Sequence, residues 1–172
     1  MKQLSLFPMD YQSPSSEQMP LFSIWKLYID GASRNNPGPA GAGVFLVRDN
    51  LVVRTCSLFL GKKTNNEAEY FALLLGLFEL TTMLQKDDLV IIISDSQLLV
   101  RQVMGMYKVK EPRLQALHAV AKQLLTGINY TISHVLREEN KDADALANKG
   151  IDTKTAASAA FIQFLRHHAV SL

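Results

Sequence analysis

The chain has 172 residues, of which 48% are hydrophobic and 20% are charged, and its formal net charge is +2. This balance is typical of a globular domain and excludes a strongly charged, disordered chain, and no apolar run reaches the roughly 20 residues that span a membrane. Cys56 is the only cysteine and no basic stretch precedes an apolar core at the start, so we expect a cytoplasmic protein without disulfides or a membrane partner.

Residues 1–23 differ in composition from the rest of the chain. They are rich in Ser, Gln, Pro and Met and have no sustained period, which predicts a flexible arm. Within this arm, Gln3–Phe7 and Gln18–Phe22 share the pattern Gln-x-x-Leu-Phe. We expect the main domain to cover residues 24–151 and residues 152–172 to form a C-terminal helix.

Three strands are predicted next. Lys26–Asp30 alternates polar and apolar residues, as a strand does. The stretch Ser33–Gly43 is crowded with Gly, Pro and Asn and is predicted to be a loop or sharp turn. Val44–Arg48 and Leu51–Leu60 are rich in β-forming residues, and Asp49-Asn50 between them suits a tight antiparallel hairpin.

Helices and strands then alternate. Thr64–Gln85 is predicted to be a long, central helix because Thr64 and Glu67 form a Thr-x-x-Glu capping box ahead of a largely apolar run. Leu89–Ile93 is a continuous apolar run, typical of a strand buried on both faces. The elements expected after it are helices at Ser96–Met104 and Pro112–Leu125, a strand at Ile128–Val135, a helix capped by Asn140 that ends at Gly150, and a helix at Thr155–His168. This order implies an α/β fold with a mixed sheet and helices on its faces.

Four acidic residues fall at the boundaries of these elements. Asp30 and Asp95 end strands, and Glu69 and Asp144 lie in the first turns of helices. Ligands of open α/β sheets bind where strand ends meet helix starts, so all four acids can converge there. Mg²⁺ prefers carboxylate oxygens, and two such ions can activate a water and stabilise the leaving oxygen of a phosphodiester.

Each acid taken alone also has an ordinary structural explanation. Asp30 suits the start of a turn, Asp95 suits a helix N-cap, and Glu69 and Asp144 complement helix dipoles. The argument for a metal site therefore depends on the four acids as a set.

Neighbouring acids compete for two of these roles. Glu67 and Glu69 are two positions apart on a helix and point about 200° apart, so they cannot easily share one site. The capping box occupies Glu67, which leaves Glu69. Between Asp142 and Asp144 we choose Asp144, because Asp142 suits the helix dipole.

These acids lie in segments that resemble the ribonuclease H type 1 family. The matching segments are Tyr28–Ser33 with Asn36–Gly38, Thr64–Glu69, Ser94–Gln97 and Asn140–Ala147, in the family's order and spacing. The resemblance implies a five-stranded mixed sheet, three antiparallel strands followed by two parallel ones, flanked by helices. It also implies hydrolysis of the RNA strand of RNA/DNA hybrids, largely independent of sequence.

The resemblance assigns roles to particular residues. It implies two Mg²⁺ or Mn²⁺ ions held by the four catalytic acids Asp30, Glu69, Asp95 and Asp144. It also implies that three polar side chains contact the hybrid's backbone or minor groove, where 2′-hydroxyls are read: Asn36, Asn66 and Gln97. From the residues alone, turn formation, helix capping and an exposed helix face are the favoured explanations of these three.

The chain departs from the family in two places. Many members carry a histidine in the loop after the last strand, but here that loop is short, which leaves His134, Arg137 or Glu138 as replacements. Some members also have a basic protrusion that grips the DNA strand. The equivalent region, Gly105–Arg113, has three basic residues but no room for an extra helix, so hybrid binding should be modest and salt-sensitive.

Two other functions remain open at this point. The chain could be a hybrid-binding module without catalysis, or another nuclease on the same fold, such as a junction resolvase. The presence of all four acids favours an enzyme, and the Asp-Gly, Thr-Asn-Asn-x-x-Glu and Asp-Ser-Gln segments favour ribonuclease H.

The N-terminal arm carries a second resemblance. Gln3, Leu4, Leu6 and Phe7 resemble the peptide by which bacterial replication and repair proteins bind the sliding clamp. This implies a clamp partner for the arm. The alternatives are that the two apolar side chains fold back onto the domain, or that so short a match arises by chance.

Overall fold

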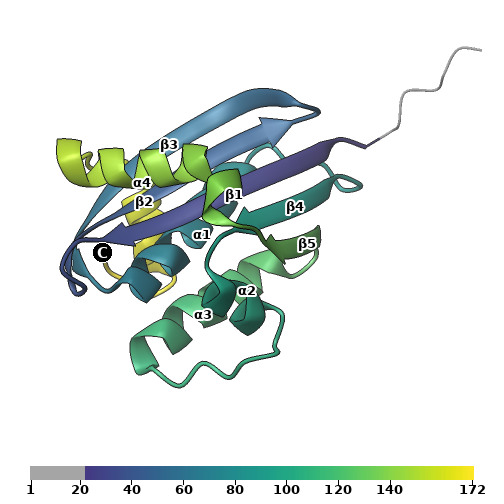
Figure 1. Ribbon diagram of the computed structural model, residues 1–172. Helices are drawn as coiled ribbons and strands as arrows, with labels where there is room; N and C mark the ends of the chain where they lie inside the picture. Colours follow the sequence, from purple (N-terminus) through teal and green to yellow (C-terminus); the bar gives the residue numbers. More distant parts are fainter. Residues whose placement is uncertain (1–21) are drawn as a thin grey trace, which may run out of the picture.

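Five strands form one mixed sheet in the order β3-β2-β1-β4-β5 in the computed structural model, which describes residues 22–172 (Figure 1). The strands are β1 (Ile24–Ser33), β2 (Gly38–Arg48), β3 (Leu51–Lys63), β4 (Leu89–Ser94) and β5 (Asn129–His134). The pairs β1–β2 and β2–β3 are antiparallel, whereas β4 runs parallel to both β1 and β5. The predicted sheet is confirmed, including the change from antiparallel to parallel pairing.

Helices cover both faces of this sheet (Figure 1). They are α1 (Asn65–Thr81), α2 (Gln97–Val103), α3 (Pro112–Leu125), the short 3₁₀ helix η1 (Arg137–Glu139), α4 (Lys141–Thr153) and α5 (Ala159–His167). Helix α4 packs on β1, β2 and β3, and α1 packs against the opposite face with α3 beside it. The ends of β1 and β4 therefore lie between the starts of α1 and α4.

Helix α1 is the central element of the core. Its residues are buried on nearly every side, as the apolar run predicts. Gly76 lies so close to β1 that an added Cβ would be 2.8 Å from the side chain of Leu27. The predicted capping box is present, but the helix ends at Thr81 rather than Gln85.

The prediction of a loop over Ser33–Gly43 was wrong for most of that stretch. Strand β1 continues to Ser33, and β2 already begins at Gly38. Glycine is unfavourable inside a strand unless another backbone needs the space. Here α4 needs it, because a Cβ on Gly41 or Gly43 would lie 2.3 or 2.1 Å from a carbonyl oxygen of that helix.

The C-terminal part also differs from its predicted limits. Gly150 does not end α4, since the helix continues to Thr153, and an added Cβ on Gly150 would meet the backbone of Leu58. The last helix starts only at Ala159, because the Thr155 carbonyl accepts a bond from the Phe59 amide and so extends the edge of the sheet. Helix α5 buries Phe161 and Leu165 in the same core as the sheet.

The predicted arm falls almost wholly outside the described residues. Within the described part, Ser23 is buried and its backbone amide donates to Asp88 at 2.8 Å. Between Phe22 and the C-terminus, none of the helices has the length and apolar character needed to cross a membrane.

Candidate active site

Three of the four predicted acids meet at the carboxyl ends of the two central strands. Asp30 lies in β1, Asp95 directly follows β4, and Glu69 lies in the second turn of α1. One carboxylate oxygen from each lies within 4.8 Å of the others. Asp30 and Glu69 are only 5% and 4% exposed, so this is a buried acidic cluster rather than a solvated surface.

Local backbone packing brings Glu69 to β1. An added Cβ on Gly31 would lie 2.1 Å from the backbone nitrogen of Glu69, so only glycine allows α1 to approach so closely. The Gly31 amide also donates to Glu69 Oε2 at 3.2 Å. The Asp-Gly pair thus supplies both an acid and the space for its neighbour.

The crowding has a clear electrostatic consequence. Burial, and then the charges of Asp95 and Asp144, raise the pKa of Asp30 to about 7. Burial and the charges of Asp30 and Asp95 also raise the pKa of Glu69 well above its ordinary value. Several negative charges are therefore costly here without a cation, and this donor set of carboxylate oxygens fits a hard divalent ion.

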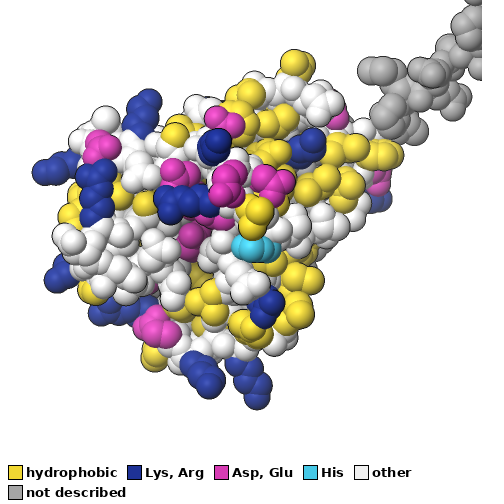
Figure 2. Space-filling model, in the orientation of Figure 1, with side chains coloured by type: hydrophobic (Ala, Val, Ile, Leu, Met, Phe, Trp, Pro, Cys, Tyr) yellow, Lys and Arg dark blue, Asp and Glu magenta, His cyan; other side chains and the backbone are white. Residues whose placement is uncertain are grey.

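Asp144 lies near the other three acids but is paired with a cation. It is half-buried in the first turns of α4 and accepts a bond from Arg137 Nη2 at 2.5 Å. Its charge contributes to the raised pKa of Asp30, which places it within electrostatic reach of the cluster. Figure 2 shows acidic side chains gathered near the middle of this face with a basic side chain among them.

The neighbouring acids take other roles. Glu67 accepts from the Thr64 amide at 2.8 Å and lies 3.7 Å from Arg113, so the capping box separates it from Glu69 as predicted. Asp142 is exposed on the first turn of α4.

A hollow of about 340 Å³ opens onto the acids. Its lining includes Arg34, Asn65, Arg137 and Asn148 as well as the three clustered acids. Three of these polar side chains, Arg34, Asn65 and Asn148, were missed from the sequence. Asn148 follows Asp144 by four positions, so helical spacing could have identified it. Asn65 directly precedes Asn66, which was predicted instead.

The three predicted substrate contacts lie outside this lining. Asn36, Asn66 and Gln97 are all exposed. The Asn36 side-chain oxygen accepts from the Asn65 amide at 2.9 Å and so holds the β1–β2 turn against the start of α1. The sequence motif therefore places a polar turn beside the hollow.

Arg137, and not His134, takes the position nearest the acids. His134 is exposed at the end of β5, where it pairs with Ser94. Arg137 lines the hollow, and its hydrogen bond with Asp144 raises the pKa of its guanidinium above the ordinary value. The charge on Arg137 is therefore permanent near neutral pH.

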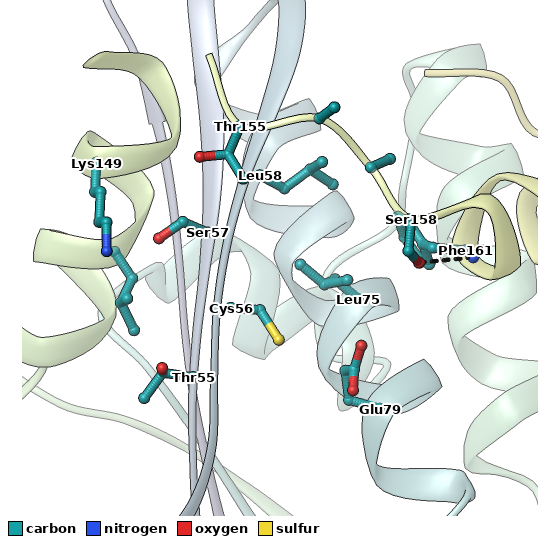
Figure 3. A pocket seen from close by; sticks show the side chains of 13 residues that line it. Thr55, Cys56, Ser57, Leu58, Leu75, Glu79, Lys149, Thr155, Ser158 and Phe161 are labelled. Atoms are coloured by element: carbon teal, nitrogen blue, oxygen red, sulfur yellow. Dashed lines mark hydrogen bonds between the residues drawn. The ribbon is translucent and has the colours of Figure 1, made fainter. Parts of the chain in front are cut away.

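A second hollow, of about 420 Å³, lies at the edge strand β3, where it meets α1, α4 and the segment before α5 (Figure 3). Burial raises the pKa of its Cys56 thiol to about 11, which leaves the thiol protonated and a poor nucleophile. Its one carboxylate, Glu79, lies 3.3 Å from Arg54. This hollow therefore offers no comparable set of catalytic groups.

Comparison with known proteins shows which family the chain resembles. Residues 28–150 match the family model described as reverse transcriptase-like. Ribonuclease HI of Halobacterium salinarum is 42% identical over 127 residues, which is 73% of this chain and 63% of the relative. The ribonuclease H of Coxiella burnetii is 33% identical over 145 residues, covering 76% of this chain and 91% of the relative.

A solved structure extends the likeness to three dimensions. The chain superposes on LC11-RNase H1, solved in complex with an RNA/DNA hybrid, with a TM-score of 0.71 and 38% sequence identity. The match covers 77% of this chain and 98% of that one. The chain spans less than two thirds of the Halobacterium relative but most of the Coxiella relative.

Proposed function

This chain belongs to the ribonuclease H type 1 family, and on that premise we propose that it is an endonuclease that hydrolyses the RNA strand of RNA/DNA hybrids. The observation that carries the proposal is the buried group of Asp30, Glu69 and Asp95, with carboxylate oxygens within 4.8 Å of one another. Purely structural acids would not be expected to crowd in this way without a cation.

Two Mg²⁺ or Mn²⁺ ions are proposed as cofactors, held by Asp30, Glu69, Asp95 and Asp144. When bound, such ions activate a water and stabilise the leaving oxygen of a phosphodiester. The raised pKa values of Asp30 and Glu69 support this assignment, because a nearby cation would relieve the cost of ionising both. Asp142 is exposed in the same helical turn and is assigned no role in the reaction.

The polar residues around the acids are proposed to hold the hybrid. Asn36, Asn66 and Gln97 would contact its backbone or its 2′-hydroxyls, and their exposure beside the acidic hollow is consistent with that role. Contacts of this kind do not read base edges, so cleavage should depend little on sequence. Lys108, Lys110 and Arg113 are exposed and would add salt-sensitive attraction to the DNA strand.

We propose that Arg137 takes the place of the missing loop histidine. It lies 2.5 Å from Asp144 and lines the acidic hollow, whereas His134 and Glu138 do not. A guanidinium cannot exchange a proton near neutral pH, so Arg137 would orient Asp144 and attract phosphate rather than act as a general base.

One assay separates the enzyme from its alternatives. The protein is incubated with labelled RNA/DNA hybrid, duplex RNA, duplex DNA and a four-way junction, each with Mg²⁺, Mn²⁺ or EDTA. The proposal requires metal-dependent loss of the RNA strand of the hybrid alone. Binding of the hybrid without cleavage would instead support a binding module, and cleavage of the junction would support a resolvase.

The clamp partner and the cytoplasmic location remain predictions from the sequence. The clamp motif Gln3, Leu4, Leu6 and Phe7 lies outside the described residues. We propose that a peptide of residues 1–12 binds a purified bacterial sliding clamp saturably, and that Leu6→Ala or Phe7→Ala weakens this binding. Absence of saturable binding by the native peptide would remove the proposal.

A further inference from the structure

Asn140 begins α4 but does not cap it with its side chain. It is 1% exposed and occupies the N-cap position, yet its side chain makes no capping bond. Instead its Nδ2 donates to the Ile29 carbonyl at 2.9 Å and to Asp95 Oδ1 at 3.0 Å. The predicted cap position is therefore confirmed, but the side chain bonds to β1 and to the residue after β4 and does not cap the helix.

The chemistry of its partners fixes the orientation of this amide. A main-chain carbonyl and a carboxylate both accept hydrogen bonds, so the amide nitrogen must face them. The Asn140 Oδ1 atom is then buried and has no hydrogen-bond partner among the described residues. Leaving a buried acceptor unpaired costs free energy, so this arrangement favours the two bonds donated by Nδ2 over a partner for Oδ1.

Asn140 also connects three of the four acid-bearing elements. Ile29 directly precedes Asp30 in β1, and Asp95 directly follows β4. The Asn140 carbonyl accepts from the Asp144 amide at 3.1 Å in the first turn of α4. One buried residue therefore links the backbone beside Asp30, the Asp95 carboxylate and the first turn of the helix that carries Asp144.

We propose that Asn140 is a positioning residue that sets the affinity of the acidic site for divalent cations. Its neutral amide restricts rotation of the Asp95 carboxylate without cancelling its charge. A lysine or arginine at this place would compete with the cation, and a second carboxylate would repel Asp95. The inference rests on the proposed function, because it gives Asn140 a role in binding the proposed cofactors.

The test compares two variants that each lose a buried hydrogen bond to an aspartate. Asn140→Leu removes the donor to Asp95 with little change in size. Trp25→Phe removes the Nε1 donor to Asp88, a 2.7 Å bond at the other end of β1, and is the matched control. Direct Mn²⁺ binding is followed by the electron paramagnetic resonance signal of free Mn²⁺, and hybrid cleavage is measured at increasing Mn²⁺.

We expect Asn140→Leu to bind Mn²⁺ roughly 10- to 100-fold more weakly, the usual effect of removing a group that orients a metal ligand. Its kcat should be low at limiting Mn²⁺ and should recover with excess Mn²⁺, while KM for the hybrid stays the same. Trp25→Phe should bind Mn²⁺ like the wild-type protein. If Asn140 only stabilised the fold, the folded molecules of the variant would bind Mn²⁺ with wild-type affinity, and excess metal would only raise the folded fraction.

Wild-type affinity for Mn²⁺ in Asn140→Leu would overturn the inference, whatever its activity. If that variant does not fold, Asn140→Ser serves instead, since its hydroxyl is too short to span both acceptors, and the same criterion applies. Failure of the wild-type protein to cleave the hybrid would instead refute the proposed function. The two failures are therefore distinguishable.

Discussion

Strands β1 and β4 have buried carboxylates near both of their ends, and the two ends treat them in opposite ways. At the beginning of the strands, Asp88 is 3% exposed and accepts bonds from the Ser23 amide, the Gln85 amide and the Trp25 ring nitrogen. These donors lower the pKa of Asp88 although burial opposes them. At the far end, Asp30, with its raised pKa, shares its pocket with other acids.

The difference separates a structural acid from the acids that we propose to be functional. Burial alone does not, because Asp88 and Glu69 are almost equally buried. The distinguishing feature is the number of N–H donors for each negative charge. Asp88 has three donors to itself, whereas the three clustered acids receive one bond from Gly31 and one from Asn140. A bound cation would stabilise the negative charges that have too few N–H donors.

The largest expected effect is on catalysis at the acidic end. Asp95→Asn should lower hybrid cleavage by more than about 100-fold, beyond the usual effect of altering a group behind the metal ligands. The fold and hybrid binding should persist, because the amide is isosteric. Cleavage is measured with a labelled hybrid in excess Mg²⁺, and a fully active Asp95→Asn protein would refute the assignment.

Without bound metal, the free energy of unfolding should depend on pH because Asp30 titrates in the acidic cluster. An unfolded aspartate ionises near pH 4, but Asp30 in the folded protein keeps its proton up to a pKa of about 7. The folded state then binds more protons, so the free energy of unfolding should fall by roughly 2–4 kcal/mol as pH rises from 4 to 7. Denaturant unfolding in EDTA measures this, with Asp30→Asn as the control that should flatten the profile. A rise across that range would contradict the account.

The structural end should show the converse behaviour. Asp88→Ala leaves the buried Trp25 ring nitrogen without its acceptor and should destabilise the fold by roughly 1–3 kcal/mol. Activity per folded molecule should be unchanged at every Mg²⁺ concentration. A selective loss of Mg²⁺ activation in Asp88→Ala would break the distinction between the two ends.

The smallest effect concerns the cation at the acidic end. Arg137→Ala should lower cleavage by roughly 10-fold, since Asp144 loses the partner that orients it. Arg137→Lys should recover part of the loss. Arg54→Ala, which removes the ion pair with half-buried Glu79 at the other end of α1, is the matched control and should leave cleavage unchanged. Equal activity of Arg137→Ala and Arg54→Ala would remove Arg137 from the site.

The sequence was sufficient to predict that Asp30, Glu69 and Asp95 lie together, because each lies in a short local pattern. A buried strand followed by Asp95, or a capping box that occupies Glu67 and leaves Glu69, is visible within a few residues. The strand order then brings three of the acids together. The partner of Asp144 was harder to predict from the sequence, since Arg137 belongs to a loop whose course depends on the packed sheet.

Contacts between distant segments explain what the sequence did not reveal. Gly41 and Gly43 were predicted to be turn residues because the helix that they contact, α4, lies about a hundred residues further along the chain. Asn140 reads as a helix cap, but its side chain reaches partners 111 and 45 residues away. A glycine or an asparagine has the same local signature in a turn as in a packed contact, so only the fold distinguishes them.

The most direct test of the central claim is thermal unfolding of the protein at pH 8 in EDTA and in excess Mg²⁺, with Asp30→Asn alongside. The wild-type protein should unfold at a higher temperature with Mg²⁺, because a ligand that binds only the folded state stabilises it. Asp30→Asn should already be more stable than the wild-type protein in EDTA and should gain much less from Mg²⁺. No effect of Mg²⁺ on the wild-type protein, or an equal gain in both proteins, would contradict the claim that these crowded carboxylates form a metal site.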